Sequence, residues 1–139
     1  MPTAFLTRRV EFAAAHRYRV PGWSDERNAA TFGPCSNPNF HGHSYRCEVT
    51  VRGQVDPTTG FAVDLAQLDR VLASEVRARF DHRNINLEVP EFADGKLMPT
   101  GENIARFIFE RVQAALGDAA EVTEVTVAED DSLRVSYRE

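Results

Sequence analysis

The stretch HGHSYRCEVTVR, residues 41–52, decides the fold because aromatic or apolar side chains alternate with charged or polar ones along most of it. Successive side chains of a β-strand point to opposite faces, so every second residue shares a face. One face of this strand carries, in order, His41, His43, Tyr45, Cys47, Val49 and Val51. The other face carries Arg46, Glu48, Thr50 and Arg52. Such alternation is typical of an antiparallel sheet with one buried face.

The rest of the chain supplies three more strands and two long helices. Residues 3–16 form a strand whose inward face ends at His16. Asp64 and Thr100 are good N-caps, since their side-chain oxygens can accept hydrogen bonds from the first turn of a helix. Apolar residues recur at helical spacing after each, as far as about Asp81 and Gly117 respectively, which predicts two helices. A short helix near residues 24–32 is expected within the long polar connection 17–40. Two strands over 122–129 and 132–137 close the chain.

The order β-β-α-α-β-β predicts an α+β fold in a single domain, residues 1–139. Two helices would cover one face of a four-stranded antiparallel sheet. An open sheet has edge strands with unpaired backbone groups. Pairing those edges with other subunits would close them into an oligomeric barrel.

Composition narrows the class of protein. The chain has 139 residues, 42% of them apolar, and a net charge of -5. Without a basic run, nucleic-acid binding is not expected, although a local basic pocket for a small phosphate is compatible with this charge. The chain has no apolar run of membrane-spanning length and no signal-peptide core, so we expect a cytoplasmic protein that does not bind membranes. Its two cysteines should be free thiols there.

His16, His41 and His43 are the candidate metal ligands. If the strand ending at His16 pairs with the strand beginning at His41, the three imidazoles converge on one face. Three protein nitrogens with an open fourth position are typical of catalytic zinc, whereas structural zinc has four protein ligands. Imidazoles without thiolates favour zinc, with iron or nickel as alternatives. The opposing interpretation is three histidines satisfied by hydrogen bonds, in the core or at the surface.

Two groups are candidates for moving protons. Cys35 lies in a loop rich in Gly, Pro and Asn, where a thiol beside a metal would have a lowered pKa and could act as a base or nucleophile. It could instead be an inert thiol, or a fourth zinc ligand that makes the site structural. Asp81 and His82 could form a proton relay in which the carboxylate sets the tautomer of the imidazole. Alternatively, His82 could simply be a histidine at the C-terminal end of a helix. Cys47 is expected in the core.

Three further residues are candidates for ligand binding. Glu129 shares the parity of Val125 and Val127, so its carboxylate should point inward and need a partner. It could accept two N–H donors from the guanidine-like edge of a ligand, or it could bend out to solvent. Thr100 and Glu102 would be, by themselves, an ordinary cap and an ordinary first-turn residue.

Five motifs resemble the signature of the 6-pyruvoyltetrahydropterin synthase family. They stand in the family's order and span nearly the whole chain: FAAAH (12–16), FGPCSNPNFHGH (32–43), DHRNIN (81–86), PTGEN (99–103) and Glu129. Two positions depart from the family's pattern. Gly101 stands where a hydroxyl residue is frequent, and Phe40 stands where the residue is often small.

The resemblance implies a fold, a reaction and a set of roles. The fold would be the tunnelling fold, a β-β-α-α-β-β subunit assembled as a homohexamer of two stacked trimers with active sites between subunits. His16, His41 and His43 would bind one zinc ion per subunit. Cys35 would be the catalytic thiolate base, and Asp81 with His82 from a neighbouring subunit the proton relay. Substrate-binding residues would be Glu129, which anchors the pterin, and Thr100 and Glu102, which lie in the segment that holds its ring.

The implied reaction is that of a lyase in tetrahydrobiopterin biosynthesis. It converts 7,8-dihydroneopterin triphosphate to 6-pyruvoyltetrahydropterin and releases triphosphate, with Mg²⁺ on the phosphates. The residues that hold the triphosphate are not part of the resemblance. Arg17, Arg19 and Lys96 are candidates by their charge alone.

Three alternatives stand beside this interpretation. A 6-carboxytetrahydropterin synthase would use the same substrate and zinc, release acetaldehyde and triphosphate, and serve queuosine biosynthesis. The five residues between Cys35 and His41 favour the pyruvoyl enzyme. A third branch, in folate synthesis, has a glutamate where this chain has Cys35, so Cys35 argues against it. The last alternative is a non-catalytic zinc- or pterin-binding module, in which Cys35 closes the metal site.

Overall fold

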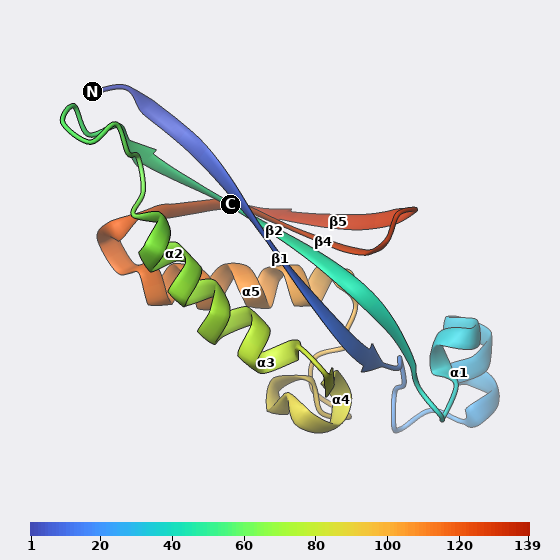
Figure 1. Cartoon of the computed structure of the whole chain (residues 1–139). Coiled ribbons are helices and arrows are strands. Elements are labelled where there is room, and N and C mark those ends of the chain that lie inside the picture. The colour runs from blue at the N-terminus through green and yellow to red at the C-terminus, as the bar shows by residue number, and fades with distance from the viewer.

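The computed structural model describes residues 1–139, and its centre is a twisted five-stranded sheet (Figure 1). The strands lie in the order β3-β1-β2-β4-β5. Their bounds are β1 Thr3–His16, β2 His41–Gln54, β3 Arg83–Asn84, β4 Glu121–Asp130 and β5 Leu133–Arg138. The α-helices are α1 Asp25–Phe32, α2 Leu65–Leu72, α3 Ala78–Phe80, α4 Ile85–Glu88 and α5 Gly101–Leu116. The predicted α+β fold is confirmed.

The long ladder between β1 and β2 is the backbone of the sheet. The two strands pair antiparallel from Thr3–Gln54 at one end to His16–His41 at the other. The predicted alternation along β2 is confirmed: Tyr45, Cys47, Val49 and Val51 are completely buried, and the residues between them are not. Burial raises the pKa of the Cys47 thiol to about 12, which fits a core residue and not a reactive one.

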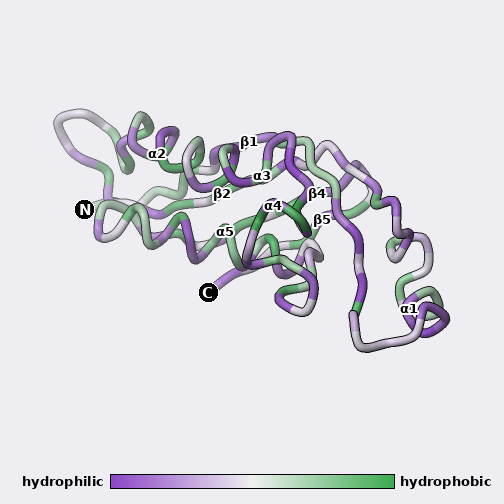
Figure 2. Tube along the Cα trace, turned by 90° about the horizontal axis from the view of Figure 1, so that it is seen from below, coloured by the Kyte–Doolittle hydropathy of each residue, from purple (hydrophilic) through white to green (hydrophobic).

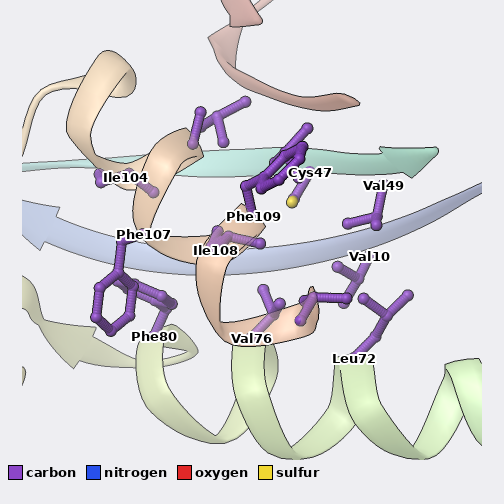
Figure 3. Packing of buried hydrophobic residues seen from close by; sticks show 14 of the residues in the cluster. Val10, Cys47, Val49, Leu72, Val76, Phe80, Ile104, Phe107, Ile108 and Phe109 are labelled. Carbon is purple, nitrogen blue, oxygen red and sulfur yellow. The ribbon is translucent and has the colours of Figure 1, made fainter. Parts of the chain in front are cut away.

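Helices α2, α3 and α5 cover one face of this sheet (Figure 1). Figure 3 shows Val10, Cys47 and Val49 of the strands facing Leu72, Val76, Phe80 and Ile108 of the helices. Burying these side chains supplies the main driving force for folding. No helix, α5 included, is both long and apolar enough to cross a membrane.

The two long helical segments begin where their caps predicted. The Asp64 carboxylate accepts a hydrogen bond from the Gln67 N–H, and the Thr100 hydroxyl accepts one from the Asn103 N–H. Between α2 and α3 the helix continues through a π-helical turn, Ala73–Arg77. Gly117 ends α5 with a φ of 56°.

The helical spacing after Asp64 and Thr100 also predicts that Leu65 and Ala115 lie on the apolar faces of the two helices, and this prediction was wrong. Leu65, in the first turn of α2, is 40% exposed, and Ala115, near the end of α5, is exposed. The neighbouring positions Leu68 in α2 and Leu116 in α5 are buried, so the faces that meet the core are narrower than the spacing predicts.

The predicted all-antiparallel, four-stranded sheet was also wrong, because a fifth strand, β3, pairs parallel with β1. It has only two residues, too few to show any periodicity. Contacts from the end of α3 hold it in place: the Asp81 carboxylate accepts from the Ala13 N–H, and the His82 N–H donates to the Ala13 carbonyl. These bonds lay the chain along the outer edge of β1.

The connection between β1 and β2 contains the expected short helix, α1, capped by Ser24. It lies apart from the body of the molecule, at the end where β1 stops and β2 starts (Figure 2). The buried Asn28 side chain holds the connection together: its carbonyl accepts from the Val20 N–H, and its amide donates to the Val20 and Ser24 carbonyls. Each of these bonds satisfies a polar group that would otherwise be costly to bury.

Phe40, which precedes the first residue of β2, has a left-handed backbone with a φ of 64°. A residue with a Cβ pays roughly 1–2 kcal/mol in this conformation, and glycine does not. We expect Phe40→Gly to be more stable than Phe40→Ala by about 1 kcal/mol in denaturant unfolding. Both variants lose the contact of the Phe40 ring with the Arg17 guanidinium, 4.7 Å from its centroid, so that contact cancels in the comparison.

The same pair of changes at Ser44, inside β2, is the control. There alanine should be the more stable by about 0.5–1 kcal/mol, because glycine weakens a strand interior. An alanine preference at residue 40 as well would show that its backbone is not strained.

Candidate metal centre

Three imidazoles converge at the end of the β1–β2 ladder. His16 pairs directly with His41 across the two strands, and His43 pairs with Ala14. The alternation of the strands places all three rings on the face that carries the core. One nitrogen from each ring belongs to a group whose members all lie within 4.8 Å of one another.

The protein holds His16 in a defined orientation. Its Nδ1 lies 2.8 Å from the Pro99 carbonyl oxygen, and since a carbonyl can only accept, Nδ1 carries the proton. Nε2 is then the nitrogen that carries the lone pair, as a metal ligand requires. A backbone carbonyl in this role is the usual outer partner of a metal-bound histidine. The Tyr45 hydroxyl lies 3.1 Å from Nδ1 and 3.4 Å from Nε2 of the same ring.

The other two rings carry unsatisfied atoms that fit a metal ion. His41 Nδ1 and His43 Nε2 are buried and have no hydrogen-bond partner, which is costly unless something else meets them. Burial lowers the pKa of His16 to about 4 and is also the main cause of the lowered pKa of His41. Both imidazoles are therefore neutral near pH 7, with lone pairs available. The donor set fits a divalent metal such as zinc.

Cys35 lies in the 3₁₀ turn Gly33–Ser36 and is partly buried. Its sulfur is not part of the compact group formed by the three imidazoles. Burial raises the pKa of the Cys35 thiol, and the Glu129 carboxylate raises it further. The expected lowering of this pKa was tied to a bound metal; the protein groups alone act in the opposite direction.

Glu129 points inward next to the imidazoles, as its parity on β4 predicted. Its Oε2 lies 3.7 Å from His43 Nε2, and its side chain is only 13% exposed. Its Oε1 accepts a hydrogen bond from the Tyr18 hydroxyl at 3.1 Å. Sequence reasoning missed Tyr18, although it stands two residues after His16 and so continues the parity of β1 onto the same face.

The segment before α5 borders the same centre. Pro99 contributes the carbonyl that holds His16, and the Thr100 hydroxyl is engaged in capping α5. Glu102 is exposed, but its charge contributes to the raised pKa of Tyr18. Gly101 is buried, and a Cβ added there would lie 3.0 Å from Val135 Cγ2. Val135 therefore occupies space that a larger residue at position 101 would need.

Asp81 and His82 are not part of the compact group formed by the three imidazoles. The Asp81 carboxylate accepts from the Ala13 N–H, and this hydrogen bond is the main cause of its lowered pKa. His82 has a left-handed φ of 59°, its side chain is 85% exposed, and its Nε2 lies 3.9 Å from the Asp81 carboxylate. It lines an open surface pocket together with Ala13, Ser44 and also His43. No hydrogen bond joins the pair to Cys35.

The three basic residues singled out by charge differ in their surroundings. Arg17 lies 3.3 Å from a carboxylate oxygen of Asp94, while its Nε is buried without a partner. Arg19 pairs with Asp25 at 2.9 Å. Lys96 is exposed. The two arginines are therefore already compensated by carboxylates.

Comparison with known proteins gives a consistent result. The profile of the 6-pyruvoyl tetrahydropterin synthase family matches residues 5–139. Human 6-pyruvoyl tetrahydrobiopterin synthase is 39% identical over 135 residues, which is 97% of this chain and 91% of that protein. The structure of 6-pyruvoyl tetrahydropterin synthase from Caenorhabditis elegans superposes with a TM-score of 0.93 at 35% identity, covering 100% of this chain and 97% of that one.

A relative with another activity also matches. Dihydroneopterin monophosphate aldolase from Pyrococcus furiosus is 29% identical over 129 residues, 91% of this chain and 90% of that protein. Its identity is well below that of the human synthase. From the profile match over nearly its whole length and from the synthases that share its sequence and fold, the chain belongs to the 6-pyruvoyl tetrahydropterin synthase family.

Proposed function

We propose that this protein is a zinc-dependent lyase that converts 7,8-dihydroneopterin triphosphate to 6-pyruvoyltetrahydropterin and releases triphosphate. The observation that carries the proposal is the three-imidazole centre, whose buried, unpartnered nitrogens lie beside the inward carboxylate of Glu129. The 39% identity to the human synthase supports the same chemistry.

The proposed metal ligands are His16, His41 and His43, for one zinc ion per subunit. When bound there, zinc acts as a Lewis acid toward the hydroxyls of the substrate side chain and acidifies the adjoining C–H and O–H groups. The Pro99 carbonyl holds the His16 ring for this task.

Glu129 is the proposed anchor of the pterin. An ionised carboxylate accepts two parallel N–H bonds from a planar, guanidine-like edge, which fixes both the position and the plane of the ring. Thr100 and Glu102, in the segment that borders the centre, complete the wall against which the ring would lie.

Cys35 is the proposed base for a side-chain proton. A metal cation bound by the three imidazoles would favour the thiolate that a base requires, whereas burial and Glu129 disfavour it. Elimination of triphosphate, with Mg²⁺ on its oxygens, leaves a side chain that becomes the pyruvoyl group by internal redox. No nicotinamide is needed.

Asp81 and His82 are the proposed second proton relay, and a neighbouring subunit would supply them. Within one chain the His82 side chain is 85% exposed and makes no hydrogen bond to Cys35, which supports a role at the centre of a neighbouring subunit. β5 is the last strand on one side of the sheet, and on the other side β3 pairs with β1 only at Ala14 and Ala15. Pairing of these free edges would build the proposed homohexamer, two stacked trimers.

The first prediction concerns the metal. The purified protein should hold about one zinc ion per chain, and His41→Ala should weaken zinc binding by more than about 100-fold, because it removes a direct ligand. Cys35→Ala should leave the zinc content unchanged. Metal analysis after dialysis against a chelator gives both values. Loss of zinc from Cys35→Ala would mean that the thiol closes the site, as in the non-catalytic alternative.

The second prediction concerns the product. Zinc-loaded protein incubated anaerobically with 7,8-dihydroneopterin triphosphate and Mg²⁺ should yield 6-pyruvoyltetrahydropterin and triphosphate by mass spectrometry. Cys35→Ala should lower kcat by about 10²–10⁴-fold with zinc retained, since general acid–base catalysis is worth that much. A carboxy product with acetaldehyde would instead assign the protein to the queuosine-type synthases. Untouched substrate would refute both lyase interpretations.

The control for this assay tests the shared site. Cys35→Ala and His82→Ala should each be inactive, and mixing the two after subunit exchange should restore part of the activity. The mixed oligomer then contains centres with an intact Cys35 from one subunit and an intact His82 from its neighbour. If the mixture stays inactive although the subunits have exchanged, the two residues do not act across an interface.

A further inference from the structure

Tyr18 contacts three of the groups assigned to the proposed reaction. It lies just beyond the end of β1, and the edge of its ring packs against His16, with centroids 5.0 Å apart and planes at 72°. Its backbone N–H donates to the Cys35 carbonyl at 2.8 Å. Its hydroxyl donates to Glu129 Oε1 at 3.1 Å. One residue therefore joins a metal ligand, the loop of the base and the pterin anchor.

The bond to Glu129 matters because that carboxylate has no other hydrogen-bond partner in the chain. Its side chain is only 13% exposed, and its other oxygen faces His43 Nε2 at 3.7 Å, beyond hydrogen-bond range. A mostly buried carboxylate without a donor tends to turn toward water. The Tyr18 hydroxyl is the group that keeps this one turned inward.

The Tyr18 bond is compatible with a ligand on the same carboxylate. A carboxylate offers about four acceptor directions, two on each oxygen. A bidentate donor uses one on each oxygen, which leaves a direction on Oε1 for the phenol. The hydrogen bond can persist while a planar N–H edge is bound, and it then fixes the plane in which that edge must lie.

We propose that Tyr18 is a positioning residue that holds the Glu129 carboxylate in the orientation that receives the N–H edge of the pterin. This inference rests on the proposed function, since it assumes that Glu129 meets a pterin. Tyr18 acts through Glu129 and takes no part in proton transfer. Its loss should therefore weaken pterin binding and leave the metal and the chemical step nearly unchanged.

The test uses zinc-loaded, full-length protein and neopterin as a fluorescent probe. Tyr18→Phe keeps the ring packing on His16 and removes only the hydroxyl. We expect it to raise the Kd for neopterin about 3–10-fold, the usual worth of one hydrogen bond, and to raise KM by a similar factor while kcat changes less than about twofold. Zinc content should equal that of the unaltered chain.

The matched control is Tyr137→Phe. Its hydroxyl also donates to a carboxylate, Glu139 Oε2 at 2.9 Å, but Glu139 is an exposed residue at the C-terminus, outside the centre. This variant should bind neopterin as tightly as the unaltered protein. A change equal to that of Tyr18→Phe would mean that the loss of any such hydroxyl produces the effect.

A double-mutant cycle separates positioning from general damage. If Tyr18 acts through Glu129, adding Tyr18→Phe to Glu129→Gln should weaken neopterin binding no further than Glu129→Gln alone. Additive losses, an unchanged Kd, or reduced zinc content in Tyr18→Phe would each overturn the inference while leaving the proposed function intact. Failure of the unaltered zinc-loaded protein to bind neopterin would overturn both together.

Discussion

The pairing of His16 with His41 is the constraint on which the rest of the site depends. It is the last rung of a ladder that runs the whole length of β1 and β2. Because side chains alternate, a slip of one residue in this register would turn every inward group of one strand outward. The core residues Phe12 and Tyr45, which pair within the same ladder, hold the register, so the energy that folds the sheet also assembles the imidazoles.

The same burial gives the centre its chemical character. It keeps the imidazoles of His16 and His41 neutral and leaves two ring nitrogens without partners, a cost to the chain that a bound cation would remove. It also places Glu129 where a single phenol is its only donor. The centre is therefore built of groups that are poorly satisfied alone and well matched to a metal and a ligand, which is a common feature of functional sites.

Much of this arrangement follows from local rules. Period-two alternation located the three histidines and the inward turn of Glu129, and capping chemistry located the helix starts at Asp64 and Thr100. Local rules could not predict the features that depend on contacts between residues distant in the sequence. The two-residue strand β3 is held in place because Asp81 and His82 form hydrogen bonds with the backbone of Ala13. Asp81 and Ala13 are 68 residues apart in the sequence. The outward placement of His82 depends on the same contacts. Tyr18 could have been found by extending the parity of β1 past its last strand residue.

X-ray absorption spectroscopy at the zinc edge of the purified protein tests most directly whether the centre is an open, three-imidazole site. The account predicts only nitrogen or oxygen neighbours at about 2.0–2.1 Å, with the outer-shell pattern of three imidazoles and one further light atom. A sulfur neighbour at about 2.3 Å would place Cys35 on the metal. That result would contradict the account, because it would make the centre a closed structural site.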